Sequence, residues 1–330
     1  MKTVAVVGST GAVGLEMLSI LEERNFPIKD LKLLASKNSA GKTQSFAGKD
    51  YTVEELTADS FAGVDIALFS AGGSRSKEFA PAAVKAGALV IDNSSAYRMD
   101  PNVPLVVPEI NPEVAKDHQG IIANPNCTTI IMGVALFPIH KKWGIKRIVV
   151  STYQAVSGAG AKAVEEWKTQ QQQIFAGGTP KAEIFSHVIA NNIFSHDSAM
   201  QANGFNEEEM KMVNETRKIF GDESIQVAPT CIRVPIERAH SESITLELNK
   251  PASLDEIRQE IGNSNGVQIL DESATQTYPM PSLVSGKNDV LVGRIRSDLF
   301  EANTVHMFVC GDQLRKGAAL NAVQIAELFL

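Results

Sequence analysis

The sequence predicts an α/β protein in which a doubly wound parallel sheet is followed by an α+β domain. At the N-terminus, a β-branched apolar run precedes a glycine-rich turn and then a helical pattern. Strand-like and helix-like segments continue to alternate up to residue 123, which is typical of a doubly wound sheet. After residue 127 the strand-like segments lengthen and fewer helices separate them, which favours an α+β arrangement.

The first half of the chain supplies the parallel sheet. Residues 2–7 (KTVAVV) suit a buried parallel strand, residues 8–14 (GSTGAVG) form a turn, and residues 15–23 have a helical pattern. Further apolar runs predict four strands, at residues 31–35, 66–69, 89–91 and 121–123. A helix-like segment covers residues 76–86.

The second half begins with a long apolar helix at residues 130–142. Strands are expected at residues 145–153, 225–234, 242–248 and 305–310. Residues 317–330 carry apolar side chains at helical spacing, so we expect this helix to pack on the first domain. The predicted domains are residues 1–127 with 313–330, and residues 128–312. Residues 170–173 (QQQQ) are interpreted as a solvated helix end, and the polar residues 176–206 as an excursion from the second domain.

Composition narrows the class of partner. The 330 residues are 44% hydrophobic and carry a net charge of -7, which favours a soluble protein and argues against nucleic-acid or anionic-membrane binding. The three cysteines are too few and too scattered for a disulfide framework or a zinc site. We find no targeting segment and no apolar run near the roughly 18 residues of a membrane span, so the cytoplasm is the predicted location.

The glycine turn predicts a dinucleotide site. Gly8, Gly11 and Gly14 lie between a predicted strand and a predicted helix, where backbone can approach a pyrophosphate and helix N–H groups can bind it. A plain tight turn is the alternative interpretation.

The segment after the second strand indicates which dinucleotide. An NAD site normally places a carboxylate there on the ribose, but no acid occurs between Asp30 and Asp50. The hydroxyls and cation of Ser36, Lys37 and Ser39 would instead accept a 2′-phosphate, so we predict NADP. The alternative is that Lys37 is an ordinary surface lysine.

Cys127 is the candidate nucleophile. It lies in residues 124–129 (NPNCTT), between a short strand and an apolar helix, so its thiol is expected near a helix N-terminus, which favours the thiolate. A small buried core residue is the alternative. Cys231 and Cys310 fit that alternative, because each lies inside an apolar strand.

Together, ordered motifs along most of the chain resemble the bacterial aspartate-semialdehyde dehydrogenase family. Besides the glycine turn and residues 124–129, they are residues 69–73 (FSAGG), 92–95 (DNSS), 107–111 (VPEIN), 151–160 (STYQAVSGAG), 208–211 (EEMK), 233–235 (RVP), 239–242 (AHSE), 292–294 (VGR) and 316–319 (KGAA). Residues 170–205 depart from the pattern. The resemblance implies a Rossmann-like NADP-binding domain and an α+β catalytic and dimerisation domain like the C-terminal domain of glyceraldehyde-phosphate dehydrogenase.

The resemblance also implies a reaction. The family interconverts L-aspartyl 4-phosphate and L-aspartate 4-semialdehyde, with NADP as cofactor and inorganic phosphate as the other product or substrate. In cells the reaction runs reductively, toward lysine, methionine, threonine and diaminopimelate. Bacterial members are homodimers or homotetramers, so this chain is expected to form one or the other.

Site residues follow by resemblance. Cys127 would form a thioester, Gln154 would orient the acyl group, and His240 would be an acid/base residue titrating near neutrality. The predicted substrate contacts are Arg233 for the α-carboxylate, Glu208 for the α-ammonium, Arg98 and Lys211 for phosphate, and Asn126. The predicted cofactor contacts are Gly8, Ser9, Thr10, Gly11, Ala12, Val13, Gly14, Ser36, Lys37, Ser39, Ser70, Ala71, Gly72, Ser157, Gly158 and Asn321.

Two other functions compete with this prediction. An N-acetylglutamyl-phosphate reductase-like enzyme would share the fold and the cysteine, but it would need no partner for a free ammonium, which Glu208 supplies. A non-catalytic Rossmann protein would bind the nucleotide without turnover, and it would leave Cys127, Gln154 and His240 unexplained. Glyceraldehyde-phosphate dehydrogenase itself matches the surroundings of Asn126 and Gln154 poorly.

Overall fold

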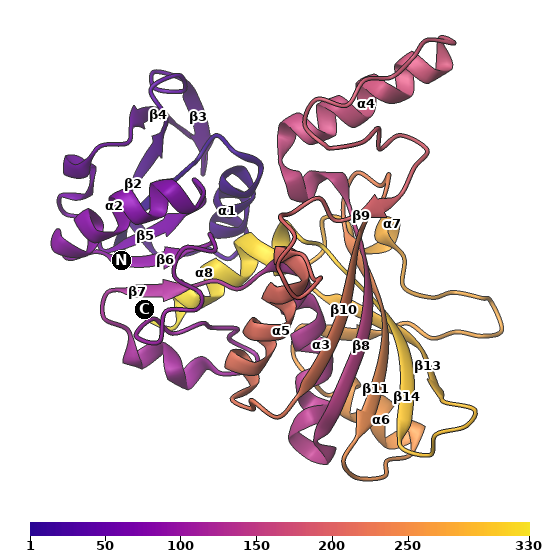
Figure 1. Ribbon diagram of the computed structural model, residues 1–330. Coiled ribbons are helices and arrows are strands. Elements are labelled where there is room, and N and C mark those ends of the chain that lie inside the picture. The colour runs from indigo at the N-terminus through magenta and orange to yellow at the C-terminus, as the bar shows by residue number, and fades with distance from the viewer. The chain divides into compact units, whose positions relative to one another are not determined.

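The computed structural model describes residues 1–330 and divides them into two units (Figure 1). Unit 1 comprises Met1–Asn126 and Gly317–Leu330, and unit 2 comprises Cys127–Lys316. The chain therefore passes between the units twice. The architecture confirms the predicted α/β first half and α+β second half. None of the helices is both long and apolar enough to cross a membrane.

Unit 1 contains a seven-stranded sheet of order β3-β4-β2-β1-β5-β6-β7. Its neighbouring strands are parallel except for the antiparallel β3–β4 pair. The strands are β1 (Lys2–Val7), β2 (Ile28–Ala35), β3 (Thr43–Phe46), β4 (Lys49–Glu55), β5 (Ile66–Phe69), β6 (Leu89–Asp92) and β7 (Ile121–Ala123). The predicted strands of this half are all present, whereas β3 and β4 are additional.

Helices cover both faces of this sheet. They are α1 (Ala12–Glu23), α2 (Gly73–Lys85) and α8 (Leu320–Glu327), with short 3-10 helices at Ala58–Phe61 and Pro112–Asp117. One apolar cluster joins α1 and α8 to the sheet through Met17, Leu33 and Val323. A second, on the other face, joins α2 through Phe69 and Phe79. The terminal helix thus packs on unit 1, as expected.

Unit 2 contains a mixed seven-stranded sheet of order β12-β13-β14-β11-β8-β10-β9. Its strands are β8 (Ile145–Gln154), β9 (Phe194–Ser195), β10 (Gln226–Arg233), β11 (His240–Leu248), β12 (Val267–Ile269), β13 (Val290–Ser297) and β14 (Thr304–Gly311). The central strand β8 is parallel to β10 and antiparallel to β11. Cys231 and Cys310 are fully buried in β10 and β14, which confirms them as core residues.

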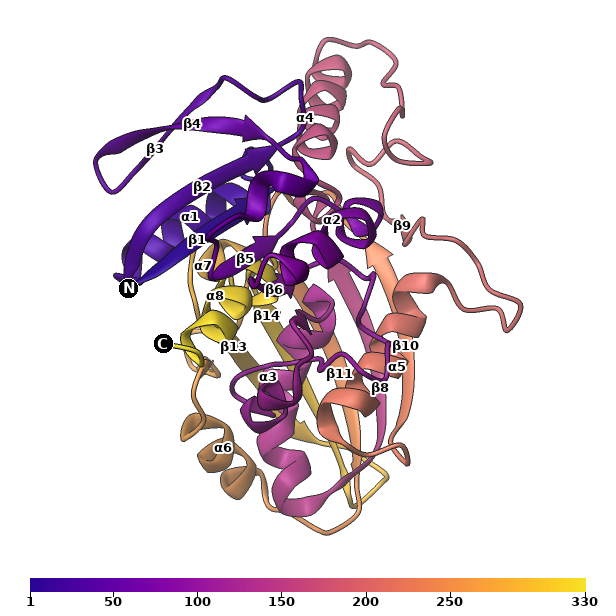
Figure 2. The same cartoon turned by 90° about the vertical axis from the view of Figure 1, so that its left-hand side faces the viewer.

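One face of the unit 2 sheet contacts three helices, seen beside the strands in Figures 1 and 2. These helices are α3 (Cys127–Trp143), α5 (Glu207–Phe220) and α6 (Leu254–Gly262). Helix α3 is apolar on nearly all sides and is buried along most of its length, as expected for a core helix. The remaining helices are α4 (Ala161–Phe175), α7 (Pro281–Val284) and a 3-10 turn at Val156–Ala159.

Within the run of four glutamines near the end of α4, Gln170 is not solvated as the sequence suggested. Gln170 is 1% exposed, and its side-chain oxygen accepts hydrogen bonds from the backbone N–H groups of Ile189 and Ala190 at 3.0 and 3.1 Å. That interpretation is therefore wrong for Gln170. A polar side chain can be buried in a helix when it satisfies the backbone of a neighbouring loop.

Candidate active site

The glycine turn joins β1 to α1 in a way that only glycine permits at two positions. Gly8 has a φ of +85°, and a Cβ there would lie 2.5 Å from the carbonyl oxygen of Ser70. A Cβ on Gly14 would lie 2.2 Å from the carbonyl oxygen of Gly8. Gly11 is the N-cap of α1, with no side-chain cap and no acidic residue in the first turn. The N–H groups of that turn therefore remain available to an anion.

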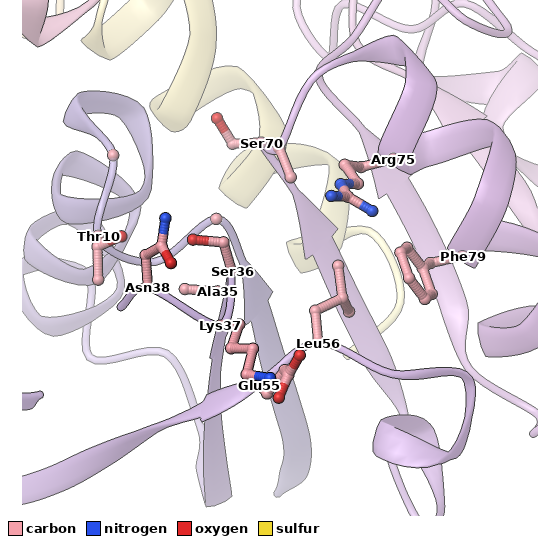
Figure 3. Close-up of a pocket in the computed structure, with 13 residues that line it drawn as sticks. Thr10, Ala35, Ser36, Lys37, Asn38, Glu55, Leu56, Ser70, Arg75 and Phe79 are labelled. Atoms are coloured by element: carbon pink, nitrogen blue, oxygen red, sulfur yellow. The ribbon is translucent and has the colours of Figure 1, made fainter. Parts of the chain in front are cut away.

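A cavity of about 480 Å³ opens beside this turn (Figure 3). Seven of the predicted cofactor residues line it: Gly8, Thr10, Gly11, Ser36, Lys37, Ser70 and Ala71. The remaining lining residues are Ala35, Asn38, Glu55, Leu56, Arg75 and Phe79. The combination of apolar walls, glycine backbone and exposed polar groups fits a nucleotide.

The charges of this cavity include two that the sequence prediction missed, Glu55 and Arg75. Lys37 and Arg75 contribute two cations, but Glu55 contributes a carboxylate (Figure 3). The register of β2 and β4 places Glu55 beside Ala35, so the acid reaches the end of β2 from a strand that was not predicted. Arg75 could have been predicted as a cofactor contact, because it lies only two residues after Gly73 in the sequence.

The other predicted cofactor residues of unit 1 do not line the cavity. Ser9 is fully buried, Thr10 donates a hydrogen bond to the hydroxyl of Ser39 at 3.3 Å, and Ala12, Val13, Gly14 and Gly72 are not among the lining residues. In α8, the buried side chain of Asn321 donates hydrogen bonds to Val106 O at 3.0 Å and to Asn124 Oδ1 at 2.6 Å. Asn321 therefore fixes the segment that precedes Cys127.

Arg98 supports the same segment. Its Nε donates to the carbonyl oxygen of Asn124 at 2.9 Å, and its Nη2 donates to the carbonyl oxygen of Asn93 at 3.0 Å. Arg98 is 7% exposed and Asn126 is 6% exposed. Both predicted substrate contacts thus lie in the buried part of unit 1 that leads to the cysteine.

Cys127 is the first residue of α3, the position expected from the sequence. Cys127 is half-buried and forms no disulfide, and no acidic residue lies in the first turn of the helix. The partial positive charge of a helix N-terminus stabilises a thiolate at this position. Burial lowers the pKa of Arg233, whereas nearby negative groups, including Cys127, raise it. Cys127 is therefore within electrostatic range of Arg233.

Three of the predicted site residues lie side by side across the unit 2 sheet. Arg233 and Gln154 are paired at the ends of the parallel strands β10 and β8. Strand β11 runs antiparallel to β8, and the pairing of Ser241 with Tyr153 places His240 beside Gln154. The sheet register thus brings together residues that are 79 positions apart, from Gln154 to Arg233, and 7 apart, from Arg233 to His240.

A hydrogen-bonded chain leads from this row to α5. Thr152 donates to Gln154 Oε1 at 3.0 Å, which turns the amide so that Nε2 donates to Glu208 Oε1 at 3.1 Å. Glu208 is 5% exposed, and its other oxygen forms an ion pair with Lys211 at 2.9 Å. The predicted ammonium-binding carboxylate and one predicted phosphate-binding cation are therefore partners.

His240 is a neutral, fully buried imidazole. Its Nδ1 accepts a hydrogen bond from the backbone N–H of Ala155 at 3.0 Å, so Nε2 carries the proton, and Nε2 has no hydrogen-bond partner. Burial and the nearby Arg233 lower the pKa of His240 to about 3, which is well below the near-neutral value expected from the sequence. The preceding residue, Ala239, has a φ of +76°, a costly conformation for alanine that aims the ring.

Of the two other residues predicted as cofactor contacts, Gly158 lies next to this ring. A Cβ on Gly158 would lie 3.2 Å from His240 Cε1 and 3.3 Å from Arg233 Nη1. The hydroxyl of Ser157 donates to the carbonyl oxygen of Glu237 and accepts a hydrogen bond from Gln313 at 2.6 Å. Gly158 thus keeps space open in front of His240, whereas Ser157 joins two loops.

Arg233 also contacts two residues that the sequence prediction missed. Its Nη2 lies 2.7 Å from His196 Nε2, and the guanidinium carbon lies 5.5 Å from the centre of the Phe185 ring. Both come from the polar excursion between α4 and α5, where no local pattern marked them.

Comparisons with known proteins agree along the whole chain. Residues 3–118 match a family described as "Semialdehyde dehydrogenase, NAD binding domain", and residues 136–316 match "Semialdehyde dehydrogenase, dimerisation domain". An aspartate-semialdehyde dehydrogenase of Synechocystis is 54% identical over 99% of this chain and 97% of its own length.

The comparison with solved structures also finds aspartate semialdehyde dehydrogenases. Aspartate semialdehyde dehydrogenase II from Vibrio cholerae, complexed with ASA, has a TM-score of 0.97 and 44% identity, covering 100% of this chain and 98% of that one. A Candida albicans aspartate semialdehyde dehydrogenase with NADP has a TM-score of 0.76 and 25% identity, covering 100% and 98%. With the glycine turn, the N-terminal cysteine of α3 and the Arg233–Gln154–His240 row in place, these matches show that the chain belongs to the aspartate-semialdehyde dehydrogenase family of oxidoreductases.

Proposed function

We propose that the chain interconverts L-aspartate 4-semialdehyde and L-aspartyl 4-phosphate, using NADP and inorganic phosphate, through a thioester on Cys127. The observation that carries the proposal is the placement of Cys127 at the start of α3, within electrostatic range of Arg233, which lies in one row with Gln154 and His240. The Vibrio cholerae relative complexed with ASA supports the substrate. This activity would serve lysine, methionine, threonine and diaminopimelate synthesis.

In the reductive direction, the Cys127 thiolate attacks the acyl carbon of L-aspartyl 4-phosphate. A C–S bond forms, and the C–O bond to phosphate breaks, so inorganic phosphate leaves. NADPH, when bound, supplies the hydride that reduces the thioester. The C–S bond then breaks, and the aldehyde and the thiolate are released.

His240 donates a hydrogen bond to the substrate oxygen in this scheme. Its Nε2 carries the proton and has no partner, so it can stabilise the negative oxygen of the tetrahedral intermediate. A substrate carboxylate on Arg233 would neutralise one of the two main causes of the lowered pKa. An α-ammonium on Glu208 would at the same time neutralise a carboxylate that raises this pKa, so His240 acts in this scheme as a neutral hydrogen-bond donor.

The remaining residues bind the two ends of the substrate. Arg233 would bind the α-carboxylate through its buried, unpartnered Nε. Glu208 would bind the α-ammonium, and Lys211 would exchange its ion pair with Glu208 for the phosphate. Arg98 and Asn126 complete the proposed phosphate and substrate contacts.

We propose NADP as the cofactor and unit 1 as the domain that binds it. The glycine positions that exclude a Cβ, the uncapped start of α1 and the cavity beside them all fit a pyrophosphate. Ser36, Lys37 and Ser39 would hold the 2′-phosphate, and Arg75 adds a second cation on the cavity wall. The Candida albicans relative with NADP supports this choice.

A homodimer through unit 2 completes the proposal, with a homotetramer as the larger alternative. The residues of β8, β11 and β14 that alternate with the helix-facing ones include the half-buried Phe308 and Tyr153 and the 40% exposed Val149. The short helix α7 covers part of this face through Val284, and apolar residues left exposed on a sheet face are typical of an interface. The matched "dimerisation domain" spans the same unit. None of the three cysteines forms a disulfide, which fits a reducing cytoplasm.

The first test is NADP reduction with L-aspartate 4-semialdehyde, followed by absorbance, with and without inorganic phosphate. Wild type should turn over only with phosphate, and Cys127→Ala should lose at least about a thousandfold in kcat while still binding NADPH. Wild type that binds NADPH without turnover would instead favour the N-acetylglutamyl-phosphate reductase-like or the non-catalytic alternative. N-acetylglutamate semialdehyde as substrate separates those two.

A further inference from the structure

The polar excursion between α4 and α5 reaches the candidate substrate site. Its short strand β9 pairs with the end of β10, with Phe194 opposite Arg233. His196, the residue after β9, donates its backbone N–H to the carbonyl oxygen of Cys231 at 2.8 Å. His196 is therefore fixed by its backbone to the strand that carries Arg233.

The side chain of His196 contacts Arg233 directly. Arg233 Nη2 lies 2.7 Å from His196 Nε2, and because a guanidinium only donates, Nε2 must accept with its lone pair. Arg233 Nη1 donates to the carbonyl oxygen of Ala155 at 2.9 Å. The guanidinium is thus fixed at both terminal nitrogens, whereas its buried Nε has no partner.

The other side of the imidazole leads to Glu208. Since Nε2 accepts, the proton lies on Nδ1, which is 3.2 Å from the hydroxyl oxygen of Ser198. The backbone N–H of Ser198 also points at Nδ1, at 3.2 Å, but it can donate only to an unprotonated Nδ1, so the shorter contact of Nε2 with Arg233, at 2.7 Å, decides the tautomer. The same hydroxyl accepts the backbone N–H of Glu208 at 3.1 Å. His196 therefore connects the proposed carboxylate-binding and ammonium-binding residues.

Burial keeps His196 neutral. It lowers the pKa of His196, Arg233 and Lys211 lower it further, and Glu208 and Asp197 oppose them. A protonated ring would lose the lone pair that accepts from Arg233 and would place two cations in contact. The neutral form is the one that the contact with Arg233 requires.

Helix α4 holds the rest of the excursion in place. The carboxylate of Glu166 accepts the backbone N–H groups of Glu183, Ile184 and Phe185, and Gln170 accepts those of Ile189 and Ala190. This arrangement holds the Phe185 ring against the guanidinium of Arg233. The hydrogen bonds to α4 thus hold the part of the excursion before β9, and the pairing of β9 with β10 holds the part that carries His196.

We propose that His196 is a positioning residue that orients the Arg233 guanidinium so that its Nε edge is presented to the α-carboxylate of the substrate. The inference rests on the proposed role of Arg233. It assigns to His196 a part in substrate selection, and it predicts that loss of the His196 acceptor weakens recognition of the carboxylate more than it weakens the chemistry.

The experiment compares His196→Leu, His196→Gln and His196→Asn with wild type. The Gln side chain can place an oxygen near the position of Nε2, whereas Asn is too short. His196→Leu should raise the KM for L-aspartate 4-semialdehyde at least about tenfold, with the phosphate KM unchanged, and His196→Gln should recover most of the loss. His187→Asn is the matched control, because His187 is exposed and contacts the ring of Phe194.

A substrate lacking the carboxylate supplies the second readout. The ratio of kcat/KM for L-aspartate 4-semialdehyde to that for 3-aminopropanal should fall about tenfold in His196→Leu and not in His187→Asn. If His196→Leu does not fold, the same ratio in His196→Asn against His196→Gln decides. An unchanged ratio, or equal losses in the Gln and Asn variants, overturns the inference.

Arg233→Lys separates this inference from the proposal beneath it. A raised KM in Arg233→Lys together with wild-type behaviour in His196→Leu would overturn the inference alone. An unchanged KM in Arg233→Lys would remove Arg233 from the substrate site and would overturn both the proposed carboxylate contact and the role of His196.

Discussion

At the residue scale, the cofactor cavity places a carboxylate, Glu55, among cations. A carboxylate near the ribose normally favours NAD by binding its hydroxyls, whereas cations favour the 2′-phosphate of NADP. Lys37 and Arg75 outnumber Glu55 in the lining, and Ser36 adds a hydroxyl. The preference between NAD and NADP therefore depends on Ser36 and Lys37, in the turn after β2.

Cofactor preference tests that balance. In the double variant Ser36→Asp with Lys37→Ala, a second carboxylate replaces a cation, so the ratio of kcat/KM for NADP to that for NAD should fall at least about tenfold. Lys42→Ala is the control, because Lys42 is exposed and does not line the cavity. An unchanged ratio in the double variant would contradict the assignment of Ser36 and Lys37.

Glu242 is a second residue whose charge decides a measurable property. It is fully buried in β11 between Thr152 and Val309, and neither carboxylate oxygen has a partner. Burial raises its pKa well above the ordinary value of 4.5, so the folded protein holds a proton there that the unfolded chain releases. This group's contribution to stability is present below about pH 4.5 and is lost as pH rises toward the folded-state pKa.

Glu242→Gln should therefore remove a pH dependence. The amide imitates the protonated acid, so the variant should have the higher Tm at pH 8, by at least about 2 °C, and the difference should shrink toward pH 5. Circular dichroism melts at several pH values measure it. Glu247→Gln, at the half-buried end of the same strand, is the comparison. A difference that grows toward acid pH would reverse the sign and refute the argument.

At the scale of elements, the sheet registers do most of the work of assembling the site. The parallel pairing of β8 with β10 and the antiparallel pairing of β8 with β11 align Arg233, Gln154 and His240 without any contribution from the loops. The excursion after α4 then adds His196 and Phe185 from outside the sheet. A rigid sheet and an attached loop thus share the positioning of one guanidinium.

The attachment of that loop to α4 can be tested separately. Gln170→Leu removes the acceptor of the Ile189 and Ala190 N–H groups while keeping the side-chain volume near its original value. Hydrogen exchange of the Ile189 and Ala190 amides should accelerate at least about tenfold, because these two amides lose a buried partner. The exposed Gln172→Leu is the control. Equal exchange rates in the two variants would show that Gln170 does not hold the loop.

Prediction from sequence succeeded for elements with strong local patterns. The run before Gly8, the helix after Cys127 and the strands ending at Gln154 and Arg233 are apolar, so burial alone marks them. Strands β3 and β4 were missed because most of their residues are exposed and polar. Helix α5 carried a usable signal, since Asn206 and Glu209 form a capping box at its start.

The candidate site divides in the same way. Cys127 and the glycine turn could be predicted because their neighbours in sequence are their neighbours in space. The link between His196 and Arg233 could not, because it joins positions 37 apart through a two-residue strand. The low pKa of His240 depends on burial and on Arg233, which only the folded sheet brings together.

At the scale of the whole molecule, the face of the unit 2 sheet opposite α3, α5 and α6 determines the predicted assembly. Light scattering should give a particle of at least twice the 35.5 kDa chain mass. Val149→Asp places a charge among the apolar residues of that face and should shift the particle toward a single chain. Leu299→Asp is the control, because Leu299 is 89% exposed and lies outside the strands. A wild-type particle of one chain mass would contradict the proposed homodimer.

The return of the chain to unit 1 has a consequence for its biosynthesis. The apolar cluster under α1 takes Leu320, Val323 and Ala326 from α8, and Arg24 forms an ion pair with Glu327 at 2.6 Å. A ribosome makes these residues only after it has made all of unit 2, whose sequence is continuous. Nascent chains usually complete their N-terminal domain first. In this chain unit 1 leaves the ribosome first but cannot complete its apolar core until α8 has been made. Its exposed apolar residues can bind chaperones until then.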